Sequence, residues 1–293
     1  MSDRSPDATP APAYVTYTSA AYAAESATEV EESTAAWLEI QAEMPFIREV
    51  SRRTFELMDL RHGQSVLDVG CGTGVMLPAL AEAVGTAGSV IGLDHAAAFL
   101  ARAHQRLRNA GLEELVRLVH GDATALPFAD GTFHVTHSER VLMHLPEPDA
   151  AIREMVRVTR PGGRVVCAEV DTRAVEFDQP DRELFEQMLQ ISASQIRNPA
   201  MGIELRRRLI GAGLHDVTAV AIADIEIRMD EDEVDEYRRQ GRELAARGMV
   251  EPDRVEAAID HLIRTNEAGT YSGLAVIFVA AGTVPDQASP PAE

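Results

Sequence analysis

The stretch VLDVGCGTG, residues 66–74, joins an apolar segment to a glycine-rich turn. The first half is β-branched and ends at a glycine, which predicts a strand over 65–70, and the pattern over 75–84 predicts a helix. The three glycines allow backbone N–H groups to approach a ligand where that helix begins. A dinucleotide fingerprint needs its third glycine one place later, where this chain has Val75. The stretch therefore predicts a strand, turn and helix with Gly-x-Gly-x-Gly spacing.

Strands and helices alternate along the chain beyond this unit. The expected strands are 65–70, 89–94, 115–122, 133–139, 164–170, 217–227 and 270–282, with Pro161-Gly162-Gly163 as a turn before the fifth. Such alternation implies right-handed βαβ units and a parallel sheet covered on both faces. The last two strands flank a helical block, which predicts an antiparallel edge strand. The expected fold is α/β, with a doubly wound, mostly parallel, seven-stranded Rossmann-like sheet.

The remaining segments are expected to surround that sheet. Between 35 and 60, apolar residues recur at three- and four-residue steps, which predicts an amphipathic helix. Helical patterns at 172–200 and 229–268 are interpreted as cap insertions. The expected organisation is a disordered leader (1–13), an N-terminal helical lid (14–60), a ligand-binding core (61–171), the C-terminal half of the sheet with its cap helices (172–282) and a flexible tail (283–293).

Composition excludes several classes of partner. The 293 residues carry a formal net charge of −20, so most of the surface repels polyanions, and we expect no nucleic-acid partner. No apolar run approaches the roughly 20 residues of a membrane helix. The N-terminus lacks a secretory layout, so a cytoplasmic protein without a membrane partner is expected. The two cysteines, Cys71 and Cys167, lie in apolar stretches and are expected as buried free thiols, with no metal site.

Aspartates stand at or near the carboxyl ends of three expected strands, where open α/β sheets bind their ligands. Asp94 comes about twenty residues after the glycines, where a carboxylate can accept hydrogen bonds from ribose hydroxyls. Asp122 could accept from an exocyclic adenine amine. Asp68 lies within an apolar strand and needs a partner, either a ligand's amino group or the glycine turn. Each feature is common alone, since aspartate also caps helices, but together and in this order they favour a nucleoside-type cofactor.

These motifs resemble those of class I S-adenosylmethionine-dependent methyltransferases of the UbiE-like group, over about 65–171. The resemblance is carried by VLDVGCGTG, GLD, GDATALPFADGTF, a His-Leu-Pro segment and TRPGGRV. His134 departs from the group, which usually has aspartate after Phe133. The resemblance implies S-adenosylmethionine as cofactor, with Asp68 and the glycines at its methionine part, Asp94 at the ribose and Asp122 at the adenine. The implied cofactor-binding residues are Asp68, Gly70, Cys71, Gly72, Gly74, Asp94, His95, Asp122, Ala123 and Ser138.

Catalysis with an activated sulfonium consists chiefly of in-line positioning, so a general base is optional. Candidates for the base are His144, just past the fourth strand, then Glu139 and Asp171 at strand ends; His144 is also explained by packing or by capping a turn. Tyr14, Tyr17 and Tyr22 precede the first helix in a chain with five tyrosines. We hypothesise that Tyr17 or another of them closes the active site, of this subunit or of a neighbour in a homo-oligomer. A surface helix without a catalytic part is the alternative.

The acceptor is less defined than the donor. Apolar residues at helical spacing in the cap favour a small, largely apolar metabolite, methylated on oxygen, nitrogen or carbon. The Ala- and Arg-rich composition is typical of a high-GC bacterial chain, which favours natural-product biosynthesis. Two alternatives remain: a cofactor-binding protein that promotes cyclisation or rearrangement, and a nicotinamide-dependent oxidoreductase. Val75 and the Gly-Asp-Ala context of Asp122 disfavour the oxidoreductase.

Overall fold

The computed structural model describes residues 38–229 and 231–286. The chain divides into two compact units. Among the described residues, one unit comprises 38–173, 194–223 and 276–286 and is called the sheet unit. The other comprises 174–193 and 224–275 and is called the helical unit. Each is described by itself.

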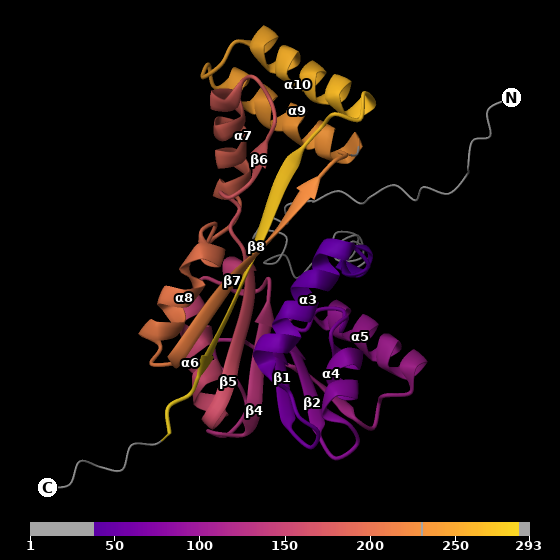
Figure 1. Ribbon diagram of the computed structural model, residues 1–293, viewed down its shortest axis with the longest axis vertical. Helices are drawn as coiled ribbons and strands as arrows, with labels where there is room; N and C mark the ends of the chain where they lie inside the picture. Colours follow the sequence, from indigo (N-terminus) through magenta and orange to yellow (C-terminus); the bar gives the residue numbers. More distant parts are fainter. Residues whose placement is uncertain (1–37, 230, 287–293) are drawn as a thin grey trace, which may run out of the picture. The chain divides into compact units, whose positions relative to one another are not determined.

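A single sheet contains all seven expected strands, and the predicted Rossmann-like α/β fold is confirmed (Figure 1). The strands are β1 (Ser65–Val69), β2 (Ser89–Asp94), β3 (Val116–His120), β4 (Phe133–Glu139), β5 (Thr159–Val170), β7 (His215–Glu226) and β8 (Gly273–Thr283), with a two-residue β6 (Glu176–Phe177) in addition. Their order is β3-β2-β1-β4-β5-β8-β6, and β7 also pairs with β8. The first five strands are parallel to their neighbours, whereas β8 is antiparallel to β5.

Strand order reverses between β1 and β4. From β1 the chain adds β2 and β3 on one side, then crosses to place β4 on the other side. The connections on the two sides of this point run in opposite directions, so a crevice opens beyond the carboxyl ends of the two strands. The fold therefore places the ends of β1 and β4 where a ligand is expected.

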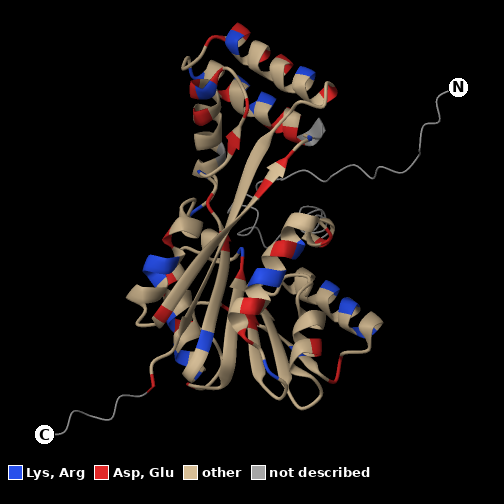
Figure 2. Ribbon diagram, viewed as in Figure 1, with Lys and Arg blue, Asp and Glu red and all other residues tan. Residues whose placement is uncertain are grey.

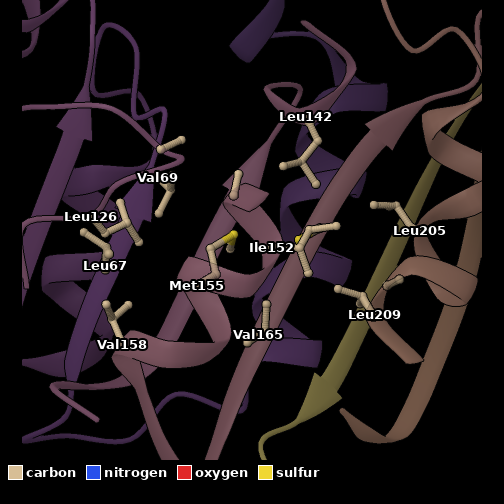
Figure 3. Packing of buried hydrophobic residues seen from close by; sticks show 14 of the residues in the cluster. Leu67, Val69, Leu126, Leu142, Ile152, Met155, Val158, Val165, Leu205 and Leu209 are labelled. Carbon is tan, nitrogen blue, oxygen red and sulfur yellow. The ribbon is translucent and has the colours of Figure 1, made fainter. Parts of the chain in front are cut away.

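Helices α6 (Pro148–Val158) and α8 (Met201–Gly211) bury their apolar stripes in one core on the sheet (Figure 3). Leu67 and Val69 of β1 belong to this core. Because side chains alternate along a strand, Val66 and Asp68 face the other side of the sheet. Helices α3 (Pro45–Met58), α4 (Leu77–Val84) and α5 (Ala97–Ala110) pack against β5, β2 and β3 respectively.

The helical unit contains α7 (Arg182–Ser194, of which the last residue belongs to the sheet unit), α9 (Glu231–Ala246) and α10 (Pro252–Glu267). Leucine, valine and methionine side chains of all three helices form its core, together with a cluster of aromatic rings. Phe177 is central to that cluster, with ring centroids 5.7 Å from Phe185 and 5.2 Å from Tyr237. Arg254 also links α10 to Asp181, just before α7, with two hydrogen bonds of 2.6 and 2.7 Å.

Several boundaries differ from expectation, and three of the differences occur at a proline or glycine. The N-terminal helix is interrupted: residues 38–42 are helical, and α3 begins separately at Pro45, which lacks the N–H of a helix interior. The helical pattern expected at 229–268 forms two helices, and α10 likewise begins at a proline. Strand β5 begins at Thr159, because Phe133 pairs with it before the register shifts. The Pro-Gly-Gly segment, with Gly162 at φ +70°, is thus an irregularity within a strand.

Charged residues of both signs are interleaved on several helices, for example along α3 and α10 (Figure 2). On α3, Arg52 pairs with Glu49 and Glu56 three and four residues away. Exposed pairs at this spacing contribute little to stability, because water and salt screen them. Within 38–229 and 231–286, no helix combines the length and apolarity that crossing a membrane requires.

Candidate functional site

The glycine turn after β1 follows a backbone path that favours glycine, with positive φ at all three glycines and no space for a side chain at Gly70. Gly70, Gly72 and Gly74 have φ of +75°, +53° and +74°. The Gly70 N–H donates to the Leu93 carbonyl at 2.7 Å, which ties the turn to β2. A Cβ on Gly70 would lie 2.3 Å from Val141 Cγ2. The turn therefore fits closely between β2 and the segment after β4.

Asp94, at the end of β2, binds the same turn from the side. Its two carboxylate oxygens accept the Gly72 and Ala96 N–H groups, each at 2.8 Å. Burial raises the pKa of Asp94, and these two N–H groups and His95 oppose the shift. His95 is half exposed, with Nδ1 3.5 Å from Asp94 Oδ1. In this structure the carboxylate predicted to hold the ribose orders the glycine turn.

Asp68 has a partner that the sequence interpretation left unassigned. Residues Asp68 of β1 and His137 of β4 are opposite each other in the parallel register, so their side chains share one face. Asp68 Oδ1 and His137 Nδ1 are 2.8 Å apart, and the residues are 3% and 0% exposed. Burial alone would lower the pKa of His137, but the hydrogen bond and the negative charge of Asp68 raise it overall. The pair lies at the point where strand order reverses.

A pocket joins this pair to the glycine turn. Its lining residues from the core are Asp68, Gly70, Cys71, Gly72, Thr73, Val75, Met76, His137, Glu139 and Arg140, and those from the N-terminal helices are Leu38, Ala42, Ile47 and Ser51. The enclosed volume is about 90 Å³, below the roughly 300–1,000 Å³ of small-molecule sites. The N-terminal helices therefore cover the turn closely.

Buried polar atoms gather at this pocket. Within the described part of the chain, Thr73 Oγ1, His137 Nε2, Glu139 Oε2 and Arg140 Nε have no hydrogen-bond partner. Buried polar groups are nearly always paired, so a cluster of exceptions indicates a ligand or water. Arg140 also has φ +56°, a left-handed conformation that is strained for a non-glycine residue and that concentrates at functional sites. Its side chain contacts Glu139 at 3.2 Å and Gln41 at 2.6 Å.

His144 lies on the short 3₁₀ helix η1 (Leu142–His144), which is held from two sides. The buried Glu169 of β5 accepts the N–H groups of Val141 and Leu142 at 3.0 and 2.7 Å, and that of the next residue at 3.3 Å. The Asn198 side chain donates to carbonyls of the same segment, the shortest bond being 2.7 Å. Burial lowers the pKa of His144 to about 4, with Arg140 adding to the shift. The imidazole is therefore neutral at neutral pH.

The structure brings some predicted residues together and places others apart. Asp68, Gly70, Cys71, Gly72 and Glu139 line the pocket, and Asp94 touches it through Gly72. Gly74, His95, Asp122, Ala123, Ser138, His144 and Asp171 are not among its lining residues. Tyr14, Tyr17 and Tyr22 lie outside the described residues.

Three of the predicted site residues that do not line the pocket lie elsewhere or bind other groups. Asp122 is exposed, and its Oδ1 accepts the N–H and hydroxyl of Thr124, each at 2.8 Å. Ser138 is in register with Cys167, a member of the core beneath α6 and α8, so it lies on the face opposite His137. Asp171 is bound by the Arg173 guanidinium at 3.0 and 3.1 Å.

The sequence interpretation did not single out three residues that the structure places at the pocket or beside it: His137, Arg140 and Glu169. His137 could have been found from the alternation along β4, since Asp68 needs a partner and a parallel neighbour supplies it. Glu169 carried a similar signal, a carboxylate inside an apolar strand. Arg140 carried none, because its role depends on a backbone conformation. Both cysteines are buried thiols as predicted.

The side chains around the pocket carry both signs of charge. Asp68 and Glu139 are the anionic groups and Arg140 is the cationic one, and the pKa of His137 is raised, which favours its charged form. The glycine turn lets backbone N–H groups come close to a ligand, and Leu38 and Ile47 contribute apolar surface. Such a donor set fits a ligand with a zwitterionic end and an apolar or aromatic body.

Comparison with known proteins gives a family for the core. Residues 67–167 match the family model described as "Methyltransferase domain". A Streptomyces fradiae protein of 37.1 kDa from transposon Tn4556 is 36% identical over 171 residues, 58% of this chain and 49% of that protein. Demethylmenaquinone methyltransferase of Shouchella clausii is 41% identical over 135 residues, 46% of this chain and 54% of that enzyme. The chain thus spans about half the length of these curated relatives.

Solved structures agree on the fold. A Bacillus halodurans protein described as a candidate methyltransferase has a TM-score of 0.54 at 18% identity, covering 80% of this chain and 98% of that one. The YcgJ protein of Bacillus subtilis has a TM-score of 0.54 at 17% identity, covering 80% and 96%. At these identities the likeness concerns the arrangement of strands and helices.

Glu169 gives a prediction for stability as a function of pH. Burial raises its pKa from 4.5 to about 8, against the three N–H groups that it accepts. Between these values the folded state keeps a proton that the unfolded state has lost, so the free energy of unfolding falls as pH rises from 5 to 8. The side chain in the Glu169→Gln variant does not ionise, so this contribution to the pH dependence of stability is absent from the variant. Thermal unfolding at several pH values should show the stability difference between wild type and variant shrinking as pH rises; a constant or widening difference contradicts the assignment.

Proposed function

Residues 67–167 are a class I methyltransferase domain of the UbiE-like group, and from this premise we propose that the chain transfers a methyl group from S-adenosylmethionine to a small, largely apolar metabolite. The observation that carries the proposal is the cluster of unpaired buried polar atoms beside the glycine turn, at the reversal of strand order. Both signs of charge are present there, as a zwitterionic amino-acid end requires. The apolar lid residues suit the rest of the ligand.

S-adenosylmethionine, the cofactor of this domain, supplies an activated methyl group on a sulfonium when bound. The chain's own contribution is binding and orientation, which can supply about 7–11 kcal/mol of a barrier when reacting groups are aligned. The Gly70–Gly74 turn would hold the amino-acid part, and Asp94 the ribose. Glu139 lies on the pocket wall, where its charge favours a cation. Leu38, Ala42 and Ile47 of the N-terminal helices line the pocket and would keep water away from the bound cofactor.

His144 is proposed as the general base for acceptors that must lose a proton. Its neutral imidazole can accept one, and the bonds to Glu169 and Asn198 fix the turn that carries it. A pKa near 4 makes it a weak base, adequate for an acceptor whose acidity is already high. Asp171 is less suited, because Arg173 holds its carboxylate.

The apolar acceptor is proposed from the covering residues and from the relatives. Demethylmenaquinone methyltransferases are named for a quinone acceptor, and an aromatic or quinone-like hydroxyl or carbon is the class we would test first. A cofactor-promoted cyclisation or rearrangement is the second candidate, because the same pocket could place a sulfonium near a substrate without methyl transfer. Natural-product biosynthesis would be the setting for either.

Incubation with methyl-labelled S-adenosylmethionine and a panel of hydroxyquinones, phenols and amines tests the proposal. We expect labelled product together with stoichiometric S-adenosylhomocysteine for at least one aromatic acceptor. Conversion of an acceptor without S-adenosylhomocysteine would support the rearrangement instead. Retained NAD(H) and no affinity for S-adenosylhomocysteine would contradict both.

The role of His144 is tested by replacement with alanine. We expect kcat to fall at least about tenfold, a conservative bound on general-base contributions that are typically about 10²–10⁴-fold, while affinity for S-adenosylhomocysteine holds. Because the pKa of the imidazole is about 4, wild-type kcat should show no ionisation of this group between pH 6 and 9. Unchanged turnover in the variant removes His144 from the reaction.

A further inference from the structure

In the buried pair of Asp68 and His137, one nitrogen of the imidazole ring makes no hydrogen bond to the described residues. Asp68 Oδ1 and His137 Nδ1 are 2.8 Å apart, so the first nitrogen of the ring is occupied. The second, Nε2, is buried and has no partner among the described residues. His137 nevertheless lines the pocket beside Glu139 and Arg140. An imidazole that lines a pocket, with one nitrogen bonded and the other buried without a partner, is suited to bind a ligand group there.

The Asp68 carboxylate determines which nitrogen of the His137 ring carries a hydrogen. A carboxylate accepts, so the Nδ1 atom must carry a hydrogen and donate it. Nε2 then carries a hydrogen only when the ring is protonated, and in the neutral ring it is an acceptor. Protonation therefore converts the pocket side of His137 from an acceptor to a charged donor.

The surroundings favour the protonated ring. Burial disfavours its charge, but the hydrogen bond and charge of Asp68 on β1, with Glu139 on β4, outweigh burial and raise the pKa of His137. Glu169 on β5 adds to this shift only when it is ionised, and its own pKa of about 8 keeps it mostly protonated at neutral pH. Arg140, directly after β4, is the opposing cation at the pocket. A charged N–H without a partner in a buried site is costly, and an anionic ligand group would remove that cost.

We propose that His137 binds the carboxylate of the cofactor's amino-acid end through Nε2–H, with Asp68 orienting the ring. The inference rests on the proposed function and adds to it a cofactor-binding residue on β4. It also predicts selectivity: a ligand with the amino-acid tail gains from His137, whereas the same nucleoside without the tail does not.

Two ligands and two variants separate this role from a structural one. S-adenosylhomocysteine carries the amino-acid tail, and 5′-methylthioadenosine is the matching thioether without it. His137→Asn can keep the bond to Asp68 but loses the distal donor, and His137→Gln can keep a distal donor but loses the bond. Calorimetric titration should show S-adenosylhomocysteine binding about 10- to 100-fold more weakly to the Asn variant, the range of a charge-assisted hydrogen bond. The Gln variant should lose less, and affinity for 5′-methylthioadenosine should be unchanged in both.

The wild-type protein provides an independent arm. As pH rises through the pKa of His137, the Nε2 hydrogen is lost. The affinity for S-adenosylhomocysteine relative to that for 5′-methylthioadenosine should therefore fall toward the value of the His137→Asn variant. The same ratio in the Gln variant should change less, which corrects for titration of the ligand's own amino group. A rising ratio means that Nε2 acts as an acceptor, which overturns the proposal.

The outcomes distinguish the two levels of inference. If wild type binds neither ligand, the proposed function fails. If wild type binds S-adenosylhomocysteine but neither variants nor pH alter its preference over 5′-methylthioadenosine, His137 is structural and the inference is wrong. Thermal unfolding of both variants identifies those that fold, and the wild-type pH series decides the matter if neither does.

Discussion

The pairing of β1 with β4 is the constraint on which the site depends. Strand order reverses there, so the crevice between the connections opens at the ends of these two strands. The parallel register sets Asp68 beside His137 and turns both away from the core beneath α6 and α8. Their hydrogen bond allows a carboxylate to remain within an apolar strand. The glycine turn, the pocket and the strained backbone at Arg140 all adjoin this pair.

A second buried acidic residue, Glu169, lies on the neighbouring strand β5 and also has its partners close by. Glu169 of β5 satisfies three N–H groups after β4 and so sets the path of the segment that carries Val141 and His144. Val141 in turn occupies the space in which a Gly70 side chain would stand. The close fit of the turn thus depends on two polar groups inside the sheet, each retained because its partners are close.

Much of the fold could be predicted from the sequence, because the signals were local. Glycine-bounded β-branched segments predicted all seven long strands, and their alternation with helices predicted a mostly parallel sheet. Asp68, Asp94 and the glycines were identified by position along single strands. His137, Arg140 and Glu169 were not, since their roles arise from register between strands or from a backbone angle. Breaks at Pro45 and Pro252 were missed because the apolar periodicity continues across them.

The central claim is that the glycine turn after β1 is the cofactor-binding element. Calorimetric titration of S-adenosylhomocysteine into wild type, Gly70→Ala and Gly111→Ala tests it most directly. Both glycines have positive φ, +75° and +66°, but an added Cβ meets Val141 at position 70 and nothing within 4 Å at position 111. We expect binding in wild type and Gly111→Ala and its loss in a folded Gly70→Ala. Equal affinity in all three proteins would contradict the account.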